Sequence, residues 1–244
     1  MGFDLDFAPD TDVDSNPKNP IIGDRAFARD ARRTSAHAAA FIRAMQDEGC
    51  IACAKHFPGH GDTLTDSHLE LPVVEREIPQ LEETELPPFA ASVAAGVGTV
   101  MTAHVLYPAW DEDVPATMSP RILDGILRKR MGYAGVIVSD DLEMKAVRGR
   151  YPLEQQLRAA SGATVDSFLV CKELGLQVEA WEGLVRLQEE GKAQEDLAID
   201  AVKRWSALRT RFLKGAPPAP GLEVLGCAAH QELALRARVE GGES

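Results

Sequence analysis

The chain contains few of the features that mark several common protein classes. Only 4 of its 244 residues are cysteines, and only Cys50 and Cys53 have the CxxC spacing of zinc or redox motifs. Because no second pair follows, the favoured interpretation is two small apolar residues entering a buried strand of a reduced protein; zinc or redox chemistry is the weaker alternative. No apolar run approaches the roughly 20 residues needed to span a bilayer, and no signal-peptide pattern opens the chain.

Basic residues are also in the minority. The 26 Lys and Arg face 38 Asp and Glu, which gives a formal net charge of −12. A nucleic-acid-binding surface or an anionic membrane is expected to attract a basic stripe, so this charge argues against both partners. The apolar share is 45%, which is too high for a disordered chain. We therefore expect a soluble acidic domain, and an enzyme is favoured.

Short apolar runs alternate with helical patterns along the chain. The strands are predicted at Phe3–Phe7, Cys50–Ala54, Gly98–Ala103, Ala134–Val138 and Ser167–Cys171. The helices are predicted at Ala36–Asp47, Leu86–Ala95, Ile122–Met131, Leu153–Ala160, Glu179–Glu190 and Leu197–Phe212. This alternation predicts an α/β fold with a parallel sheet covered by helices. A (β/α)₈ barrel takes about 250 residues, but only five strands are found, which leaves open a smaller sheet or a barrel lacking its first units.

The most unusual polar segment follows the second predicted strand. The sequence KHFPGHGDTLTDSH, residues 55–68, combines three His, two Asp and one Lys. Asp66 and His68 are two residues apart, so in an extended segment both side chains point the same way. A carboxylate beside an imidazole sets its tautomer and favours its protonated form, as a general acid/base requires. This density favours a functional loop over one that merely satisfies its own backbone.

Asp140 and Asp141 end the most apolar predicted strand. Burying two adjacent carboxylates is costly unless they have partners or a task. We expect one of the two to be a nucleophile and the other, on the opposite face of the strand, to cap the following helix at Leu142. The alternative is that both residues are caps.

Other polar residues near strand ends give weaker signals. Arg25 lies in a loop where its donor fork would meet substrate oxygens, although a surface salt bridge is the commoner role. His104 follows the third predicted strand. Two roles are equally open for it, a functional residue or a buried histidine whose ring nitrogens are hydrogen-bonded within the core. The acidic loop formed by Asp10, Asp12 and Asp14 could hold a cation or be solvated; solvation is favoured, with Asp12 as the one exception.

Two reaction types remain open on these residues alone. In the first, a carboxylate and an acid/base pair flank a glycosidic bond without a metal. In the second, His56, His60, His68 and the aspartates bind a divalent metal that activates water. The HxxxH spacing of His56 and His60 suits zinc only on a helix, and Pro58 with Gly59 excludes a helix there, so the metal reading is disfavoured.

Three segments taken together resemble one family. FAPDTDVDSNPKNPIIGDRAF, KHFPGHGDTLTDSHLELP and GVIVSDDLEMKAV look like consecutive motifs of the family 3 glycoside hydrolases. They are most similar to the bacterial β-N-acetylglucosaminidases (β-hexosaminidases) of peptidoglycan recycling. The segments MTAHVLYPAWD and SFLVCKE also follow the family's order, so the resemblance extends from Phe3 to Lys172.

The resemblance implies a reaction and a role for six residues. The reaction is hydrolysis of terminal β-linked N-acetylglucosamine from peptidoglycan fragments with retention of configuration, and it needs no cofactor. The implied roles are Asp140 as nucleophile, His68 as acid/base, Asp66 as its partner, and Arg25, Lys55 and His56 as ligands of the sugar hydroxyls. A glycoside phosphorylase of the same family, or an inactive truncated barrel that only binds sugar or takes part in assembly, remains the alternative.

The resemblance also implies a TIM-type (β/α)₈ barrel of which this chain holds only the last five strand–helix units. Residues 1–214 would form the partial catalytic domain, residues 215–221 a Pro-rich linker and residues 222–244 a tail with one weak helix. Family members begin with a further segment that contains the first three strands. The run Phe3–Phe7 would then be an unpaired edge, so we expect self-association or a natural protein that begins earlier. Asp10 is a departure, because the family usually has an apolar residue there.

Overall fold

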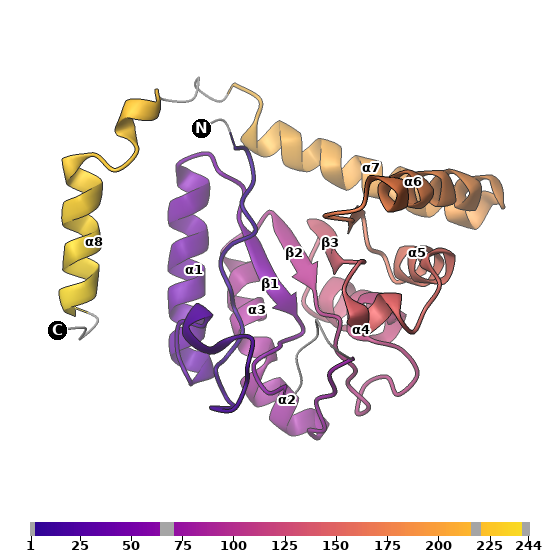
Figure 1. Cartoon of the computed structure of the whole chain (residues 1–244), viewed down its shortest axis with the longest axis horizontal. Helices are drawn as coiled ribbons and strands as arrows, with labels where there is room; N and C mark the ends of the chain where they lie inside the picture. The colour runs from indigo at the N-terminus through magenta and orange to yellow at the C-terminus, as the bar shows by residue number, and fades with distance from the viewer. Residues whose placement is uncertain (1–2, 64–70, 216–220, 241–244) are drawn as a thin grey trace.

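The computed structural model describes residues 3–63, 71–215 and 221–240 (Figure 1). Its centre is a parallel sheet with the strands in chain order, β1-β2-β3-β4. The strands are β1 (Cys53–Phe57), β2 (Thr99–Thr102), β3 (Val136–Asp141) and β4 (Ser167–Leu169). The α/β class and the parallel sheet predicted from the alternating pattern are therefore confirmed.

The first predicted strand, Phe3–Phe7, is present only as an edge segment. It runs beside β1 and is joined to that edge of the sheet by two isolated parallel bridges, Leu5 with Ile51 and Asp10 with Lys55. The segment thus occupies the place of a fifth strand without a continuous ladder. The chain continues along this edge beyond Phe7, and the second bridge places Asp10 beside Lys55, near the carboxyl end of the sheet.

Helices lie between the successive strands and continue after β4 (Figure 1). They are α1 (Ala31–Asp47), α2 (Ile78–Thr84), α3 (Leu86–Ala94), α4 (Lys145–Arg148), α5 (Leu153–Gly162), α6 (Leu174–Glu189), α7 (Lys192–Phe212) and α8 (Ala228–Glu240). A π-helix, η3, spans Arg121–Arg130, and short 3₁₀ turns lie at η1 (Gly23–Arg25), η2 (Ala116–Met118) and η4 (Leu222–Val224). Within the described part of the chain, no helix is both long enough and apolar enough for a membrane span.

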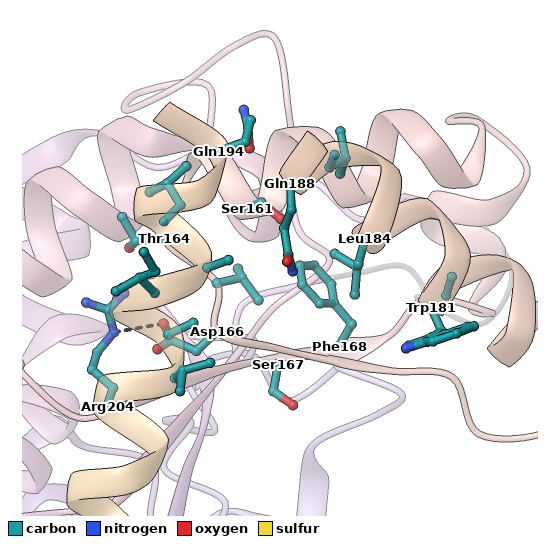
Figure 2. A pocket seen from close by; sticks show the side chains of 18 of the residues that line it. Ser161, Thr164, Asp166, Ser167, Phe168, Trp181, Leu184, Gln188, Gln194 and Arg204 are labelled. Carbon is teal, nitrogen blue, oxygen red and sulfur yellow. Dashed lines mark hydrogen bonds and ion pairs between the residues drawn. The ribbon is translucent and has the colours of Figure 1, made fainter. Parts of the chain in front are cut away.

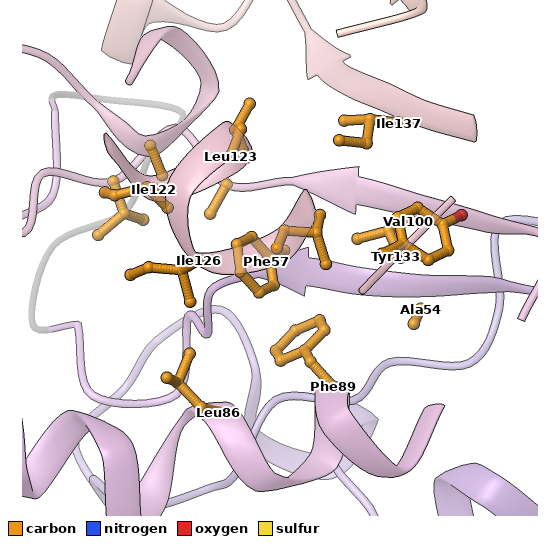
Figure 3. Close-up of a cluster of buried hydrophobic side chains, with 14 of the residues drawn as sticks. Ala54, Phe57, Leu86, Phe89, Val100, Ile122, Leu123, Ile126, Tyr133 and Ile137 are labelled. Atoms are coloured by element: carbon orange, nitrogen blue, oxygen red, sulfur yellow. The ribbon is translucent and has the colours of Figure 1, made fainter. Parts of the chain in front are cut away.

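The main core lies between one face of the sheet and the helices α1, α3 and η3 (Figure 3). Phe57 from β1 packs edge-to-face on Phe89 from α3, with 5.2 Å between the ring centroids. Val100 and Ile137 add the next two strands to the same cluster, and all four side chains are buried. Burying each such side chain stabilises the fold by roughly 1.5–3 kcal/mol. This layer holds the strand ends in fixed register.

The other face of the sheet is partly covered by α7. Leu208 packs with Ile51, Val136 and Val138, so apolar side chains on alternate strand positions meet this helix. α7 begins five residues earlier than the predicted helix Leu197–Phe212. Both faces of the sheet are therefore apolar, as the continuous apolar strands predicted.

Two short helices, α2 and α4, were not predicted from the sequence. α2 begins with a proline in its first turn, where the missing N–H costs nothing. The Glu77 side chain accepts a hydrogen bond from the N–H of Gln80, and the Gln80 side chain accepts one from the N–H of Glu77. This reciprocal capping stabilises the start of α2 despite its length of seven residues.

A pocket of about 750 Å³ opens at the β4 edge between α5, α6 and α7 (Figure 2). Its lining includes Phe168 from β4, Leu184 and Trp181 from α6, and Val202 from α7. Trp181 and Val202 are 66% and 65% exposed. Arg25, Lys55, His56 and Asp140 are not among the residues that line this pocket.

Candidate active site

The candidate residues lie in two irregular stretches at the carboxyl ends of β1 and β3. The pairing of β1 with β2 shifts register around Lys55 and His56, and the pairing of β3 with β4 shifts around Ser139 and Asp140. Such β-bulges redirect side chains and occur next to active sites. The carboxyl ends of parallel strands also collect catalytic residues in α/β folds. The sheet therefore presents Lys55, His56 and Asp140 at one edge.

Asp140 is a partly exposed carboxylate at the end of β3. Its Oδ1 accepts the N–H of Asp141 at 2.8 Å. Burial raises the pKa of Asp140, but the facing imidazoles of His56 and His104 and the Asp141 amide outweigh it, so the pKa lies below its ordinary value. An ionised carboxylate that remains reachable is what a nucleophilic aspartate requires.

Asp12 is the buried centre of a hydrogen-bond network. Its side chain is 0% exposed. Its Oδ2 accepts the Nδ1–H of His56 at 2.8 Å, and its Oδ1 accepts the backbone N–H of His60 at 2.7 Å. The segment around Asp12 runs along the β1 edge and is covered by the loop that follows β1. The expectation of a solvated acidic loop is therefore wrong for Asp10, which is also buried, whereas Asp12 is the exception that was expected.

His56 connects Asp12 to Arg25. The Arg25 Nη2 lies 3.4 Å from the Nε2 of His56, and a guanidinium only donates, so Nε2 is the acceptor and Nδ1 holds the proton. Burial lowers the pKa of His56, although the carboxylates of Asp140 and Asp10 oppose that shift. The imidazole is thus neutral and fixed in one tautomer. Its partner Arg25 has a side chain that is 43% exposed and can reach a ligand.

Asp66 and His68, the predicted acid/base pair, lie outside the described residues. The start of their loop is held by Asn19, whose Nδ2 donates to the carbonyl oxygens of His60 at 2.8 Å and Gly61 at 3.0 Å. Gly61 is required there, because a Cβ would lie 1.6 Å from the carbonyl oxygen of Val13. The roles of Asp66 and His68 remain predictions. Asn19 was missed, since nothing in its local pattern separates it from an ordinary turn residue.

Glu85, between α2 and α3, was also missed. It is 1% exposed, and neither carboxyl oxygen has a hydrogen-bond partner among the residues that the structure describes. Burial, the charge of Asp12 and that of Asp62 raise its pKa to about 8, although Arg76 opposes this. Its carboxyl group lies against Gly59, where a Cβ would approach Oε2 to 2.2 Å. A neutral Glu85 therefore packs beneath the loop that leads to Asp66 and His68.

His104 and Asp141 have structural contacts. The Nε2–H of His104 donates to the carbonyl oxygen of Asp141 at 3.1 Å. The Asp141 Oδ1 accepts the backbone N–H groups of Glu143 at 3.1 Å and Cys171 at 3.3 Å. The next helix, α4, begins at Lys145. The expectation that Asp141 caps a helix at Leu142 is therefore wrong, because its side chain instead ties the loops after β3 and β4 together.

Asp10, Asp12 and His56 are the residues of the described chain whose ligand atoms are grouped as a metal site would need, within 4.8 Å of one another. The His56 Nδ1 already donates to Asp12, and the Arg25 guanidinium lies 3.2 Å from Asp10. A cation would have to replace both interactions. The donor set therefore fits a histidine–carboxylate–arginine network better than a metal centre. All four cysteines are free thiols.

The sequence and the fold were compared with known proteins. The glycosyl hydrolase family 3 N-terminal domain matches residues 1–208. The chain belongs to glycosyl hydrolase family 3. A β-hexosaminidase from Xylella fastidiosa (strain M23) is 44% identical over 170 residues, which are 70% of this chain and 50% of that protein. The chain thus spans about half the length of the curated relatives it matches.

Two solved structures of this family resemble the chain closely. The family 3 β-N-acetylglucosaminidase from Paenibacillus sp. str. FPU-7 superposes with a TM-score of 0.91 at 38% identity, over 96% of this chain and 45% of that one. NagZ from Neisseria gonorrhoeae, in complex with N-trifluoroacetyl-D-glucosamine, gives a TM-score of 0.73 at 32% identity over 100% of this chain and 65% of that one. The resemblance inferred from the motifs is therefore confirmed.

Proposed function

We propose that this family 3 chain provides the nucleophile and part of the sugar site of a retaining exo-glycosidase that hydrolyses terminal β-linked N-acetylglucosamine. The observation that supports this most is Asp140, an ionised and partly exposed carboxylate at the end of β3 that faces two buried imidazoles. The relatives described as β-hexosaminidase and β-N-acetylglucosaminidase support the sugar. The resemblance at DSH, residues 66–68, supports the acid/base.

In the first step, an Asp140 carboxylate oxygen attacks the anomeric carbon and the glycosidic C–O bond breaks. His68, oriented by Asp66, donates its proton to the departing oxygen. In the second step, water attacks the same carbon, His68 accepts its proton and the bond to Asp140 breaks. Two inversions give net retention of configuration. After the second step His68 has regained its proton and Asp140 is again a free carboxylate. The cycle therefore needs no oxidant, reductant or further group.

Arg25, Lys55 and His56 form the sugar-binding group in this proposal, with Arg25 and Lys55 in contact with the hydroxyls. Arg25 is exposed and Lys55 partly exposed, so both can reach a ligand, whereas the buried His56 mainly fixes the guanidinium. A rigid donor fork on a neutral imidazole suits recognition of neutral hydroxyl groups. The finer assignments, peptidoglycan fragments as substrate and the cytoplasm as location, are part of the same proposal.

The test uses aryl N-acetylglucosaminides with leaving groups of increasing basicity. His68→Ala should slow substrates with poor leaving groups most, because activated phenols depart without protonation. Asp66→Ala should give a milder version and shift the pH profile, since the carboxylate sets the charge of the imidazole. Since the chain spans about half of its relatives, the variants are measured in the chain and in the chain extended by the remaining β/α units of a relative.

Equal slowing of activated and unactivated substrates by His68→Ala would contradict the assignment. Two alternatives are separated in the same assay. A sugar 1-phosphate formed in the presence of phosphate identifies a phosphorylase, and sugar binding without turnover in the extended protein identifies a binding module. Self-association through the Phe3–Phe7 edge also remains a prediction, and sedimentation at rising concentration tests it.

A further inference from the structure

Asp10 is a buried carboxylate at the carboxyl end of the sheet. Its backbone is fixed by the bridge to Lys55, and its side chain is 6% exposed. Its Oδ1 accepts the backbone N–H of Asp12 at 3.1 Å. Its Oδ2 lies 3.2 Å from the Arg25 Nη2, but accepts no aligned hydrogen bond in the structure. The Asp10 side chain therefore acts on Arg25 mainly through its charge.

The same Arg25 nitrogen lies between two groups. Nη2 is 3.2 Å from the Asp10 Oδ2 and 3.4 Å from the His56 Nε2. His56 is held in turn by Asp12 at 2.8 Å. One edge of the guanidinium thus lies against buried groups, although the Arg25 side chain as a whole is 43% exposed. Because the fork is planar and rigid, fixing one edge sets the direction of the remaining donors.

The Asp10 charge is costly to the folded chain. Burial and the neighbouring Asp12 raise the pKa of Asp10 to about 7, although His56 and Arg25 oppose the shift. The folded state therefore binds the proton more tightly than the unfolded state does, and stability falls as the pH rises through about 7. Carboxylates that cost stability in this way gather at functional sites.

We propose that Asp10 is a positioning residue that orients the Arg25 guanidinium toward the bound sugar. This inference rests on the proposed function, in which Arg25 holds a hydroxyl of N-acetylglucosamine. Asp10 does not contact the sugar itself, because its Oδ2 is enclosed. It fixes Arg25 in advance, so that less side-chain freedom is lost when the sugar binds.

The first test is a binding titration of Asp10→Asn with N-trifluoroacetyl-D-glucosamine, followed by ¹⁹F NMR. Asparagine keeps the acceptor for the Asp12 N–H and removes the charge beside Arg25. We expect the dissociation constant to rise roughly tenfold. In an Arg25→Ala background, Asp10→Asn should cause no further change, since the residue that it positions is absent. Asp14→Asn is the matched control, because Asp14 pairs with Arg29 at 3.0 Å on the same segment.

The second test separates positioning from a structural role. Above pH 7, Asp10→Asn should melt at a higher temperature than the wild type, because it removes a buried charge. A residue needed only for the fold would lose stability and binding together. Lower stability, or an equal loss of binding with and without Arg25, would overturn the proposal.

A third measurement keeps the inference testable if the proposed function fails. The side-chain N–H signal of Arg25 should move in Asp10→Asn and stay in place in Asp14→Asn. If the wild-type chain and its extended form bind no sugar but the signal moves, the proposed function falls and the positioning of Arg25 is supported. An unchanged Arg25 signal overturns the positioning whether or not the sugar binds.

Discussion

Carboxylates at the two opposite ends of the sheet differ in how many of their oxygens have hydrogen-bond or ion-pair partners. At the amino end, Asp166 is fully enclosed, and both of its oxygens have partners. They accept from Arg128 Nη2 at 2.7 Å, Arg204 Nε at 2.8 Å and the N–H of Ile137 at 2.8 Å (Figure 2 shows the Arg204 contact). This amino-end group fixes η3 and α7 to the sheet.

The carboxyl-end group is less complete. The Oδ2 of Asp10 accepts no aligned hydrogen bond, and Asp140 is left partly exposed between imidazoles. Arg25, the cation nearest Asp10, has an open side where Arg128 is enclosed. A buried carboxylate whose oxygens all have hydrogen-bond partners indicates a role in stability. A carboxylate at a strand end with an unpartnered oxygen or an exposed side indicates a role in binding and chemistry.

The largest expected difference between variants at the two ends of the sheet is in catalytic activity. Asp140→Asn should lower turnover of aryl N-acetylglucosaminides by several powers of ten, because the attacking carboxylate is gone. Asp166→Asn should retain wild-type turnover per folded molecule. Initial rates divided by the folded fraction from circular dichroism make this comparison. Comparable losses in the two variants would remove the distinction between the ends of the sheet.

The second difference concerns stability. Asp166→Asn should lower the free energy of unfolding by about 3–5 kcal/mol, since Arg128 and Arg204 are left without a counter-charge. Urea unfolding of the variant and the wild type gives the value. Asp200→Asn is the control, because the Asp200–Lys203 pair is exposed and its loss should not be measurable. A stable Asp166→Asn would show that the amino-end group is not structural.

The third prediction extends the comparison to Glu85. Its pKa is raised to about 8 from an ordinary value near 4.5. Stability from this group is therefore complete below pH 4.5 and is lost as the pH rises through about 8. Glu85→Gln should flatten that decline and unfold at higher urea than the wild type at alkaline pH. Parallel stability–pH curves for the two proteins would mean that Glu85 is not held neutral.

The smallest effect is expected at the surface pair of Asp14 and Arg29. Arg29 is 75% exposed, so Asp14→Asn should change the free energy of unfolding by roughly 0–1 kcal/mol. Sugar binding should also be unchanged. A clear loss of binding in Asp14→Asn would show that the whole acidic segment, and not Asp10, controls Arg25.

The sequence predicted the features that depend on local pattern. The apolar runs located all four strands of the sheet. β1 spans Cys53–Phe57 where Cys50–Ala54 was expected, so it includes the polar residues Lys55 and His56 that the apolar pattern excluded. The motif residues that precede and follow the strands gave the family. The π-helix η3 was predicted as helical, within one residue at each end.

The features that were missed depend on contacts between distant segments. The burial of Asp10 depends on its bridge to Lys55, which lies far along the chain, and no local pattern separates Asp10 from a solvated loop residue. Asn19 holds the loop after β1 from 41 residues away. Glu85 lies in an ordinary acidic helical stretch, and only the approach of Gly59 in the folded chain removes it from water.

The most direct test of the account is to trap the proposed intermediate. A fluorinated N-acetylglucosaminyl fluoride, in which the second step is slow, is incubated with the extended protein, and the digested peptides are weighed by mass spectrometry. The account predicts one sugar on the peptide that ends β3, with fragmentation placing it on Asp140. A sugar on Asp141, on a residue outside that strand, or rapid turnover with inverted product would contradict the account.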